Sequence, residues 1–540
     1  MELTLRILGV ILRILGLIVR PILRLLYRKQ TGKIPKITND LLKIPAVDLA
    51  EKIRNKEVKS EYVVRLYIER LREVNKIINA VVDERYKEAL EEAKKADQMC
   101  ETMTPIYLLQ NYPLLGVPFT VKESIGVKGL LHTVGSLARL NEKADKDGES
   151  VRLLRAAGAI PLCVSNTPEW YEWFPFKIIF IKKKSNFKSR CMSWESYNHV
   201  TGRTLNPYDL SRTAGGSSGG EAALIGAGAS IFGPGSDIGG SIRIPSLFTG
   251  IFGHKPTAGV VSLNGHFPYS SDKNFLNYLV VGPMCRYAKD LYPLLQIMSG
   301  DNASKLRLDE PILTKDIKIY YREDVGDSIS FMSIDTDIQH AMKRALDHFN
   351  SNGLTIKRAT SLNLADSFEI GISLLLGIKE MPDLLGYRKD NKLRDSALLE
   401  MAKCIVGKSQ YTFSSLTMAY INDSRAMMPE HKIAKYTEEA EDLRKEFINL
   451  LGENGVFFYP TYCKPAIHHY ESLVTLSGVV YAKFFNVMGF PSCHIPMGLN
   501  SEGLPIGFQV VAAPYQDRLC LAMAVELEHA FGGWVEPPRL

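Results

Sequence analysis

The sequence predicts an α/β protein in which helices cover a β-sheet. The chain has 540 residues, of which 46% are apolar and 23% charged, and this composition excludes a mainly disordered chain. Some segments repeat apolar residues with a helical period, whereas other segments are short apolar runs typical of buried strands. Mixing of these two patterns along one chain favours a sheet packed between helices.

The secondary-structure elements can be assigned in chain order from these patterns. Residues 46–99 have a 3.6-residue apolar period and many Glu/Lys pairs, which predicts one or two surface helices. Residues 149–158 predict a helix that ends at a glycine. Further helices are expected at 335–351 and 436–451, and strands at 115–121, 159–164, 317–321, 455–460 and 506–512.

The net charge of +7 is confined to two segments. Residues 1–39 carry +7 and residues 174–190 carry +6, so the remainder of the chain is acidic at −6. This distribution of charge disfavours a basic groove for nucleic acid spread over the fold. The eight cysteines form no C-x-x-C pair and are too few for a disulfide scaffold, which favours a reducing, intracellular compartment.

The N-terminus is expected to associate with a membrane. Residues 3–27 are mostly Leu, Ile and Val. On a helix, the four arginines of this range and the next residue, Arg28, form one narrow stripe: Arg6, Arg13, Arg20, Arg24 and Arg28. The longest uncharged runs have six residues, whereas a spanning helix needs about 20. We therefore expect a helix lying in the interface, with its arginines toward lipid phosphates. A spanning helix with snorkelling arginines, a cleaved signal peptide and a helix packed on the body are the alternatives.

These patterns divide the chain into three parts. Residues 1–30 are the expected membrane-associated helix, and residues 31–45, with two prolines, are the expected linker. Residues 46–540 form the body. The sequence leaves the oligomeric state open, a homodimer included.

A glycine-serine tract indicates where the chemistry lies. Residues 215–240 contain ten of the 41 glycines, and such density implies close approach of backbone segments. A small-residue helix is expected to begin at 217–219, with free N–H groups there. The tract lacks the lysine of a phosphate-binding P-loop. Its G-x-S-x-G match to a nucleophile elbow follows a polar, turn-like segment rather than a strand, which disfavours that interpretation.

No metal or cofactor is expected. His468 and His469 are adjacent, so they would not face one site on a helix, and the chain has no H-E-x-x-H motif. Both histidines are interpreted as surface or core residues.

Three blocks in order carry a family resemblance. They are Gly-Val-Pro-Phe-Thr-Val-Lys-Glu-Ser at 116–124, Gly-Gly-Ser-Ser-Gly-Gly at 215–220 with Asp-Ile-Gly-Gly-Ser-Ile-Arg-Ile-Pro at 237–245, and Gly-Leu-Pro-Ile-Gly-Phe-Gln at 503–509. Together they resemble the amidase signature family over about residues 45–540. The resemblance implies a single α/β domain around a mixed sheet.

The resemblance also implies a catalytic triad of Lys122, Ser217 and Ser241, with a cis peptide before Ser217. A serine hydroxyl is a poor nucleophile until a base takes its proton, and a lysine is a base only when neutral. Lys122 ends an apolar run, where burial would lower its pKa. In this interpretation Ser217 passes the proton of Ser241 to Lys122 and returns it to the departing amine.

The residues around the nucleophile have implied supporting roles. The backbone N–H groups of Ile238, Gly239, Gly240 and Ser241 resemble the family's oxyanion hole. We interpret Asp237 and Arg243 as a charge-assisted contact that holds the loop, and Ser218 as a support rather than a catalyst.

The substrate is suggested by a closer resemblance, to the fatty-acid amide hydrolase 2 branch of the family. The segments that carry it are 166–169, 194–209 and 531–534. The implied reaction is hydrolysis of a long-chain fatty acid amide to fatty acid plus amine or ammonia, which fits a membrane-associated enzyme whose substrate dissolves in lipid. The alternatives are an amidase for small soluble amides or glutamine, similar to an amidotransferase A subunit, and a non-catalytic, membrane-bound lipid-binding relic.

One segment departs from the family. About residues 171–190 form an insertion that is rich in lysine and aromatic residues. It is interpreted either as a second membrane-touching loop or as translated intron sequence.

Overall fold

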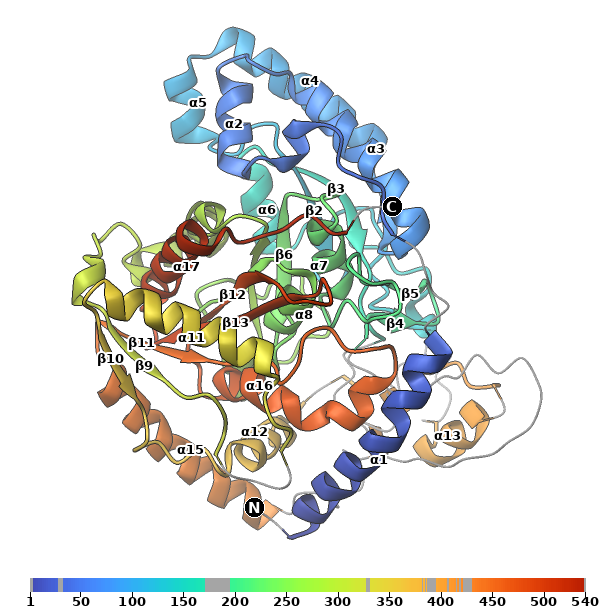
Figure 1. Ribbon diagram of the computed structural model, residues 1–540. Coiled ribbons are helices and arrows are strands. Elements are labelled where there is room, and N and C mark those ends of the chain that lie inside the picture. Colours follow the sequence, from blue (N-terminus) through green and yellow to red (C-terminus); the bar gives the residue numbers. More distant parts are fainter. Residues whose placement is uncertain are drawn as a thin grey trace.

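The computed structural model describes residues 3–27, 33–169, 195–326, 331–380 and 430–538, with short stretches between 382 and 420. An eight-stranded sheet and a three-stranded sheet form the centre of the molecule, and helices surround them (Figure 1). The α/β class is thus confirmed. The insertion predicted at 171–190 lies outside the described residues.

The large sheet is mixed, as the resemblance implied. Its strands are β6 (Phe232–Asp237), β7 (Phe252–Lys255), β8 (Val280–Cys285), β9 (Lys318–Tyr321), β10 (Thr355–Arg358), β11 (Gly455–Tyr459), β12 (Ser492–Leu499) and β13 (Pro505–Ala512). They lie in the order β10-β9-β11-β13-β12-β7-β8-β6. β9 pairs in parallel with β10 and β11, and all other pairs are antiparallel.

The small sheet supplies one half of the site. It consists of β1 (Val81–Glu84), β3 (Ile160–Ser165) and β2 (Pro118–Lys122), with β3 in the middle. β2 runs parallel to β3 and lies beside β6 of the large sheet. The approach is so close that a side chain at Gly233 would meet the Thr120 carbonyl oxygen at 2.3 Å. The two sheets therefore meet at β2 and β6.

Helices cover both sheets. α2 (Ala46–Arg54), α3 (Ser60–Ile78), α4 (Tyr86–Thr102) and α5 (Pro105–Asn111) form a layer at the top of Figure 1. The remaining α-helices within the described residues of the body are α6 (Glu149–Ala156), α7 (Gly219–Gly226), α8 (Arg243–Thr249), α9 (Lys273–Tyr278), α10 (Leu291–Ser299), α11 (Thr336–Ser351), α12 (Ser367–Leu376), α13 (Ala397–Ile405), α15 (Glu430–Leu451), α16 (Val480–Val487) and α17 (Asp517–Phe531).

The elements match the expected ones except in the first hundred residues. The predicted strands correspond to β2, β3, β9, β11 and β13, and the predicted helices to α6, α11 and α15. Residues 46–99, where one or two helices were expected, contain α2, α3 and most of α4 with β1 between α3 and α4. β1 has only four residues and no fully buried side chain, so its apolar signal is weak beside the helical period around it.

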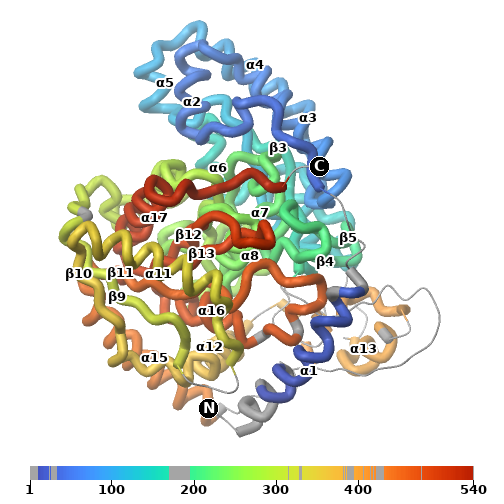
Figure 2. The backbone as a smooth tube through the Cα atoms, in the orientation of Figure 1, coloured from blue at the N-terminus to red at the C-terminus, as the bar shows by residue number. Residues whose placement is uncertain are grey.

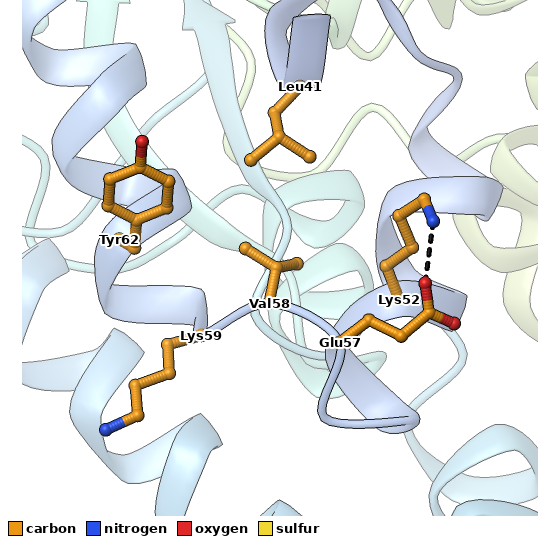
Figure 3. A pocket seen from close by; sticks show the side chains of 6 residues that line it. All are labelled: Leu41, Lys52, Glu57, Val58, Lys59 and Tyr62. Atoms are coloured by element: carbon orange, nitrogen blue, oxygen red, sulfur yellow. Dashed lines mark hydrogen bonds and ion pairs between the residues drawn. The ribbon is translucent and has the colours of Figure 1, made fainter. Parts of the chain in front are cut away.

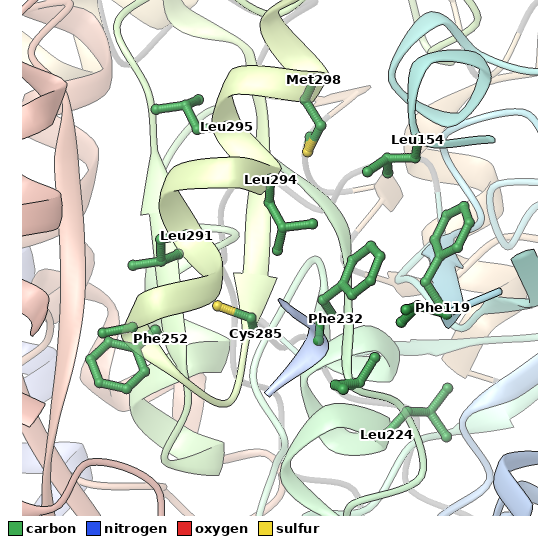
Figure 4. Close-up of a cluster of buried hydrophobic side chains, with 14 of the residues drawn as sticks. Phe119, Leu154, Leu224, Phe232, Phe252, Cys285, Leu291, Leu294, Leu295 and Met298 are labelled. Atoms are coloured by element: carbon green, nitrogen blue, oxygen red, sulfur yellow. The ribbon is translucent and has the colours of Figure 1, made fainter. Parts of the chain in front are cut away.

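The hydrophobic core continues across the junction of the sheets. Phe119 of β2 stacks on Phe232 of β6 with ring centroids 5.3 Å apart, and Leu224 of α7 lies in the same cluster (Figure 4). Burial of such large side chains stabilises each by about 1.5–3 kcal/mol. Apolar packing therefore holds the two sheets together.

The N-terminal helix packs on the body with its apolar face outward. α1 (Leu3–Tyr27) lies against the body of the molecule (Figure 2). It contacts the 3₁₀ helix η6 (Glu471–Val479), where Arg20 Nε forms an ion pair with Glu471 Oε1 at 2.8 Å. Six apolar side chains of α1 are each at least 46% exposed: Ile11, Ile14, Leu17, Ile18, Ile22 and Leu25.

This arrangement corrects the expectation that Arg20 points toward lipid phosphates. The Glu471 side chain is only 6% exposed, and a carboxylate removed from water needs a cationic partner. Among the described residues, no helix has the length and hydropathy required to cross a bilayer.

The expected linker is also attached to the body. Ile34 and Ile37 are buried in the core, and the Ile37 N–H donates to Glu536 Oε1 at 2.9 Å.

Candidate active site

Lys122 lies where the two sheets meet. It is the last residue of β2 and is completely buried. Its Nζ is 2.6 Å from Ser217 Oγ and 3.0 Å from Ser236 Oγ, and it lies 3.3 Å from the Ser236 carbonyl oxygen. The structure thus joins Lys122 and Ser217, which are 95 residues apart in sequence, by a direct contact.

The environment of Lys122 favours the neutral amine. Burial lowers the pKa of Lys122 well below its ordinary value, against the opposing attraction of the carboxyl groups of Asp237 and Glu221. A neutral amine can accept a proton, so the geometry and the electrostatics both suit a general base.

The serine tract folds as a turn that leads into a helix. The Gly216–Ser217 peptide is cis, as the resemblance implied. α7 starts at Gly219 with Ser218 as its N-cap residue, within the expected 217–219 region.

The glycines of this tract allow close backbone contact, as their density predicted. A side chain at Gly220 would lie 2.4 Å from the backbone nitrogen of Asn166. Asn166 and Thr167, from one of the branch-specific segments, hold this turn. The Gly220 N–H donates to the Asn166 carbonyl at 3.1 Å, and Thr167 Oγ1 donates to the Ser217 carbonyl at 3.0 Å.

Ser241 lies in the turn between β6 and α8, next to the serine tract. The Ser218 N–H donates to the Ser241 carbonyl oxygen at 3.2 Å, which joins the two segments. Ser218 Oγ also donates to the Ser236 carbonyl at 3.3 Å, consistent with a supporting role. Ser217 and Ser241 are almost fully buried, at 5% and 7% exposure.

Asp237 and Arg243 form the expected charge-assisted contact. Both are fully buried, and Arg243 Nε lies 3.1 Å from Asp237 Oδ2. Arg243 also donates to Gln509 Oε1 at 2.8 Å and to Asn486 Oδ1 at 2.6 Å. Gln509 ends the third sequence block, so this contact explains why a segment so distant in sequence belongs to the pattern.

The Asp237 carboxylate shapes the loop that carries Ser241. It accepts the N–H groups of Gly240 at 2.6 Å and of Ile242 at 3.0 Å. Burial alone would raise the pKa of Asp237, but the charge and hydrogen bonds of Arg243 and these N–H groups hold it well below its ordinary value. The Gly240 N–H, expected to point at an oxyanion, is thus engaged by Asp237.

Sequence reasoning missed several residues of the site. Ser236 contacts Lys122 directly, and its position just before Asp237 in the quoted block was the available signal. Asn486 donates to the Asp237 carbonyl and to its carboxylate, both at 2.9 Å. Lys483 of α16 is buried, its stem faces Gly239, and its Nζ lies 4.8 Å from the centre of the Phe368 ring. Burial lowers the pKa of Lys483 to about 7, opposed by Glu369.

No metal centre is found in the part of the chain that the structure describes, since it contains no group of three or more His, Cys, Asp or Glu side chains suited to one. His469 is a buried core histidine whose Nδ1 lies 2.9 Å from Glu195 Oε2.

A surface hollow lies away from these residues, on the α2–α3 side (Figure 3). Lys52 and Glu57 form an ion pair there at 2.7 Å. Its lining residues are Leu41, Lys52, Glu57, Val58, Lys59 and Tyr62. None of them belongs to the cluster around Lys122.

Comparison with known proteins places this site in a family. A family model described as Amidase matches residues 62–174 and 179–521, which include all three sequence blocks. The chain belongs to the amidase family. The match omits only four residues of the insertion, 175–178.

Several relatives of this amidase are similar over almost their whole length. The chain is 40% identical to fatty-acid amide hydrolase 2-B of Danio rerio, with 94% of this chain and 93% of that protein covered. It is 39% identical to fatty-acid amide hydrolase 2 of Homo sapiens, with 97% and 96% covered.

A solved structure of a fatty acid amide hydrolase superposes with a TM-score of 0.68 at 20% identity, over 94% of this chain and 92% of that one. A 6-aminohexanoate cyclic dimer hydrolase also gives a TM-score of 0.68, at 22% identity, with 93% of this chain and 99% of that chain covered. These structural matches support the amidase fold.

Proposed function

We propose that this chain hydrolyses long-chain fatty acid amides to a fatty acid and an amine or ammonia, with Ser241 as the nucleophile. The observation that carries the chemistry is the 2.6 Å contact between the buried Lys122 amine and the Ser217 hydroxyl. Support for the substrate comes from the 39–40% sequence identity to proteins named fatty-acid amide hydrolase 2 and fatty-acid amide hydrolase 2-B.

The reaction begins with one proton path. The neutral Lys122 amine takes the proton of Ser217 while Ser217 takes the proton of Ser241, and the Ser241 oxygen attacks the amide carbonyl. The protonated Lys122 then returns the proton through Ser217 to the departing nitrogen, because an amide anion is a very poor leaving group. The C–N bond breaks and an acyl ester on Ser241 remains. Water hydrolyses that ester by the same path, which restores Ser241.

The negative charge on the carbonyl oxygen requires backbone donors. Because the Gly240 N–H donates to Asp237, we assign the oxyanion to the N–H groups of Ile238, Gly239 and Ser241. Loss of one such donor typically costs about 2.7–4 kcal/mol of transition-state stabilisation. Asp237 and Arg243 act by fixing this loop, and Ser218 by joining it to the serine tract.

We further propose that α1 associates with an intracellular membrane, with its exposed apolar side chains in the lipid. Six exposed apolar residues in a helix of 25 form a continuous face that water solvates poorly. A substrate dissolved in the same membrane would then be held near the enzyme.

The test uses purified full-length protein and a series of acyl amides of increasing chain length, with glutamine as a separate substrate. We expect hydrolysis to rise with chain length and to be lost in Ser241→Ala. A fluorophosphonate probe should label Ser241 in the wild type. Preference for short amides or glutamine would replace the lipid assignment by the soluble-amidase alternative, and a wild type that is neither active nor labelled would support the non-catalytic alternative.

A further inference from the structure

A second buried carboxyl group holds the strands around Lys122. Glu221 belongs to α7, lies four residues after Ser217 and is completely buried. The Thr120 hydroxyl donates to Glu221 Oε1, and the Ser165 hydroxyl donates to Glu221 Oε2 at 2.7 Å. One carboxyl group therefore joins α7 to β2 and to β3.

These two hydroxyls lie next to the reactive amine along the strands. Thr120 is two residues before Lys122 on β2, so both side chains point to the same face of the strand. Ser165 is the β3 residue directly paired with Lys122. The Glu221 carboxyl thus holds β2 directly at Thr120. It also holds the paired strand β3 at Ser165, opposite Lys122.

The large sheet accommodates the Glu221 carboxyl because β6 has a glycine, Gly233, beside it. A side chain at Gly233 of β6 would overlap Glu221 Oε1, with the added carbon only 2.0 Å from that oxygen. Glu221 consequently fills the space between β2 and β6, where Lys122 of one sheet meets Ser236 of the other.

We infer that Glu221 is a positioning residue for the hydrolysis: its carboxyl group fixes Lys122 against Ser217 by joining β2, β3 and α7. The inference rests on the proposed function, because it assumes that Lys122 is the base. The hydrogen bonds of the Glu221 carboxyl within the described residues are made with Thr120 and Ser165, so it acts through the strands and through its charge.

The charge of Glu221 has a predictable sign of effect. Burial lowers the pKa of Lys122, whereas the negative charges of Asp237 and Glu221 oppose that shift. Burial raises the pKa of Glu221 itself to about 7, and hydrogen bonds from Ser165 and Thr120 oppose that rise. In the part of the chain that the structure describes, Cys163 of β3 also interacts electrostatically with Glu221, and His266 interacts with Lys122. Removal of the Glu221 charge should therefore lower the pKa of Lys122 further.

The experiment compares Glu221→Gln, Glu221→Ala and Ser165→Ala. The readout is the rate of fluorophosphonate labelling of Ser241 against pH, together with kcat/KM for a long-chain amide. In Glu221→Gln the acid limb of both profiles should move to lower pH, because the carboxylate, which is charged above its pKa of about 7, no longer favours the protonated Lys122 amine. In Glu221→Ala, which also opens a gap between the strands, labelling at high pH should fall on the order of 100-fold. Ser165→Ala keeps the Thr120 contact but removes one hydrogen bond that lowers the pKa of Glu221. Because the carboxyl is then charged over a narrower pH range, the acid limb should move in the same direction by less.

The matched control is Glu528→Gln. Burial also raises the pKa of Glu528 to about 7, but this residue lies on α17 and accepts the Ala288 N–H at 3.0 Å. Its substitution should leave the pH profile unchanged while lowering the melting temperature.

The inference is overturned if Glu221→Gln and Ser165→Ala both keep the wild-type acid limb and lose labelling only in proportion to thermal stability. If Glu221→Gln does not fold, the profile of Ser165→Ala decides alone. A wild type that is labelled at Ser241 but hydrolyses no fatty acid amide would reject the proposed substrate and leave this inference standing.

Discussion

The junction of the two sheets and the N-terminal helix solve opposite physical problems. At the junction, polar side chains are removed from water, and the Asp237 carboxylate is held by Arg243 and two backbone N–H groups. On α1, apolar side chains such as Leu17, 73% exposed, face outward, and Arg20 holds the helix to the body by an ion pair. The proposed chemistry needs fixed distances, whereas the proposed attachment of α1 to a membrane needs only exposed apolar area. The two regions should therefore respond very differently to substitution.

The largest effect is expected at Lys122. Lys122→Met removes the proposed base, and we expect labelling of Ser241 and amide hydrolysis to fall on the order of 10³–10⁴-fold. The activity of the wild type should rise with pH, because the amine loses its proton as pH rises through its lowered pKa.

Lys255→Met is the matched control for that substitution. Lys255 is equally buried and burial lowers its pKa to about 7, but its amine donates to the Pro256 carbonyl. Loss of labelling in Lys255→Met equal to that in Lys122→Met would argue that any buried lysine substitution disrupts the site.

The next effect is on stability, at Arg243. Arg243→Met leaves the Asp237 carboxylate buried without its cation and should lower the free energy of unfolding by about 3–5 kcal/mol. The folded-state pKa of Asp237 is depressed, so its stabilising contribution is present above the unfolded value of about 3.9 and is lost as pH falls. Chemical denaturation at several pH values should show the difference between variant and wild type shrinking in acid.

An exposed arginine provides the comparison for Arg243. Arg152 pairs with Glu149 at 2.7 Å but is 57% exposed, and Arg152→Met should cost less than about 1 kcal/mol. Equal losses in the two variants would contradict the importance given to the buried pair.

The apolar face of α1 is tested by vesicle binding. Replacement of Ile14 and Ile18 by glutamate should lower partition into phospholipid vesicles on the order of 100-fold, because each buried isoleucine contributes about 1.5–3 kcal/mol. Hydrolysis of a short soluble amide should not change. Leu109→Glu, which alters an equally exposed apolar residue on α5, should leave vesicle binding unaffected. Unchanged binding of the double variant would reject α1 as the membrane contact.

The smallest effect is expected at the contact between α1 and the body. A double-mutant cycle of Arg20→Gln and Glu471→Gln should give a coupling free energy of about 1 kcal/mol, since the pair is partly shielded from water. A coupling of zero in thermal denaturation would mean that the ion pair does not hold the helix.

The sequence predicted the parts of the site that depend on local motifs. The family resemblance of short blocks implied Lys122, Ser217 and the cis peptide before Ser217. The structure contains that cis peptide and places Lys122 and Ser217 in contact. It also places Ser241 beside Ser218, although its role as nucleophile stays a prediction.

Features that depend on long-range packing were not predictable in this way. The contacts of Arg243 with Gln509 and Asn486 join residues more than 240 positions apart. The hydrogen bond from the Gly240 N–H to Asp237 depends on the path of the loop between β6 and α8. The direction of the Arg20 side chain depends on Glu471. The periodicity of residues 3–27 carries no information that Glu471 lies beside α1.

The cluster around Lys122 lies between two sheets that are hydrogen-bonded separately. Its geometry therefore depends on the packing of one sheet against the other. Lys122 comes from the small sheet and Ser236 from the large one, so their 3.0 Å contact exists only while β2 lies against β6. A chain that retained all its strands and helices but let the sheets separate would keep its far-ultraviolet spectrum and lose its reactivity toward a serine-directed probe. Loss of Ser241 labelling during denaturation would consequently report separation of the two sheets before the secondary structure unfolds.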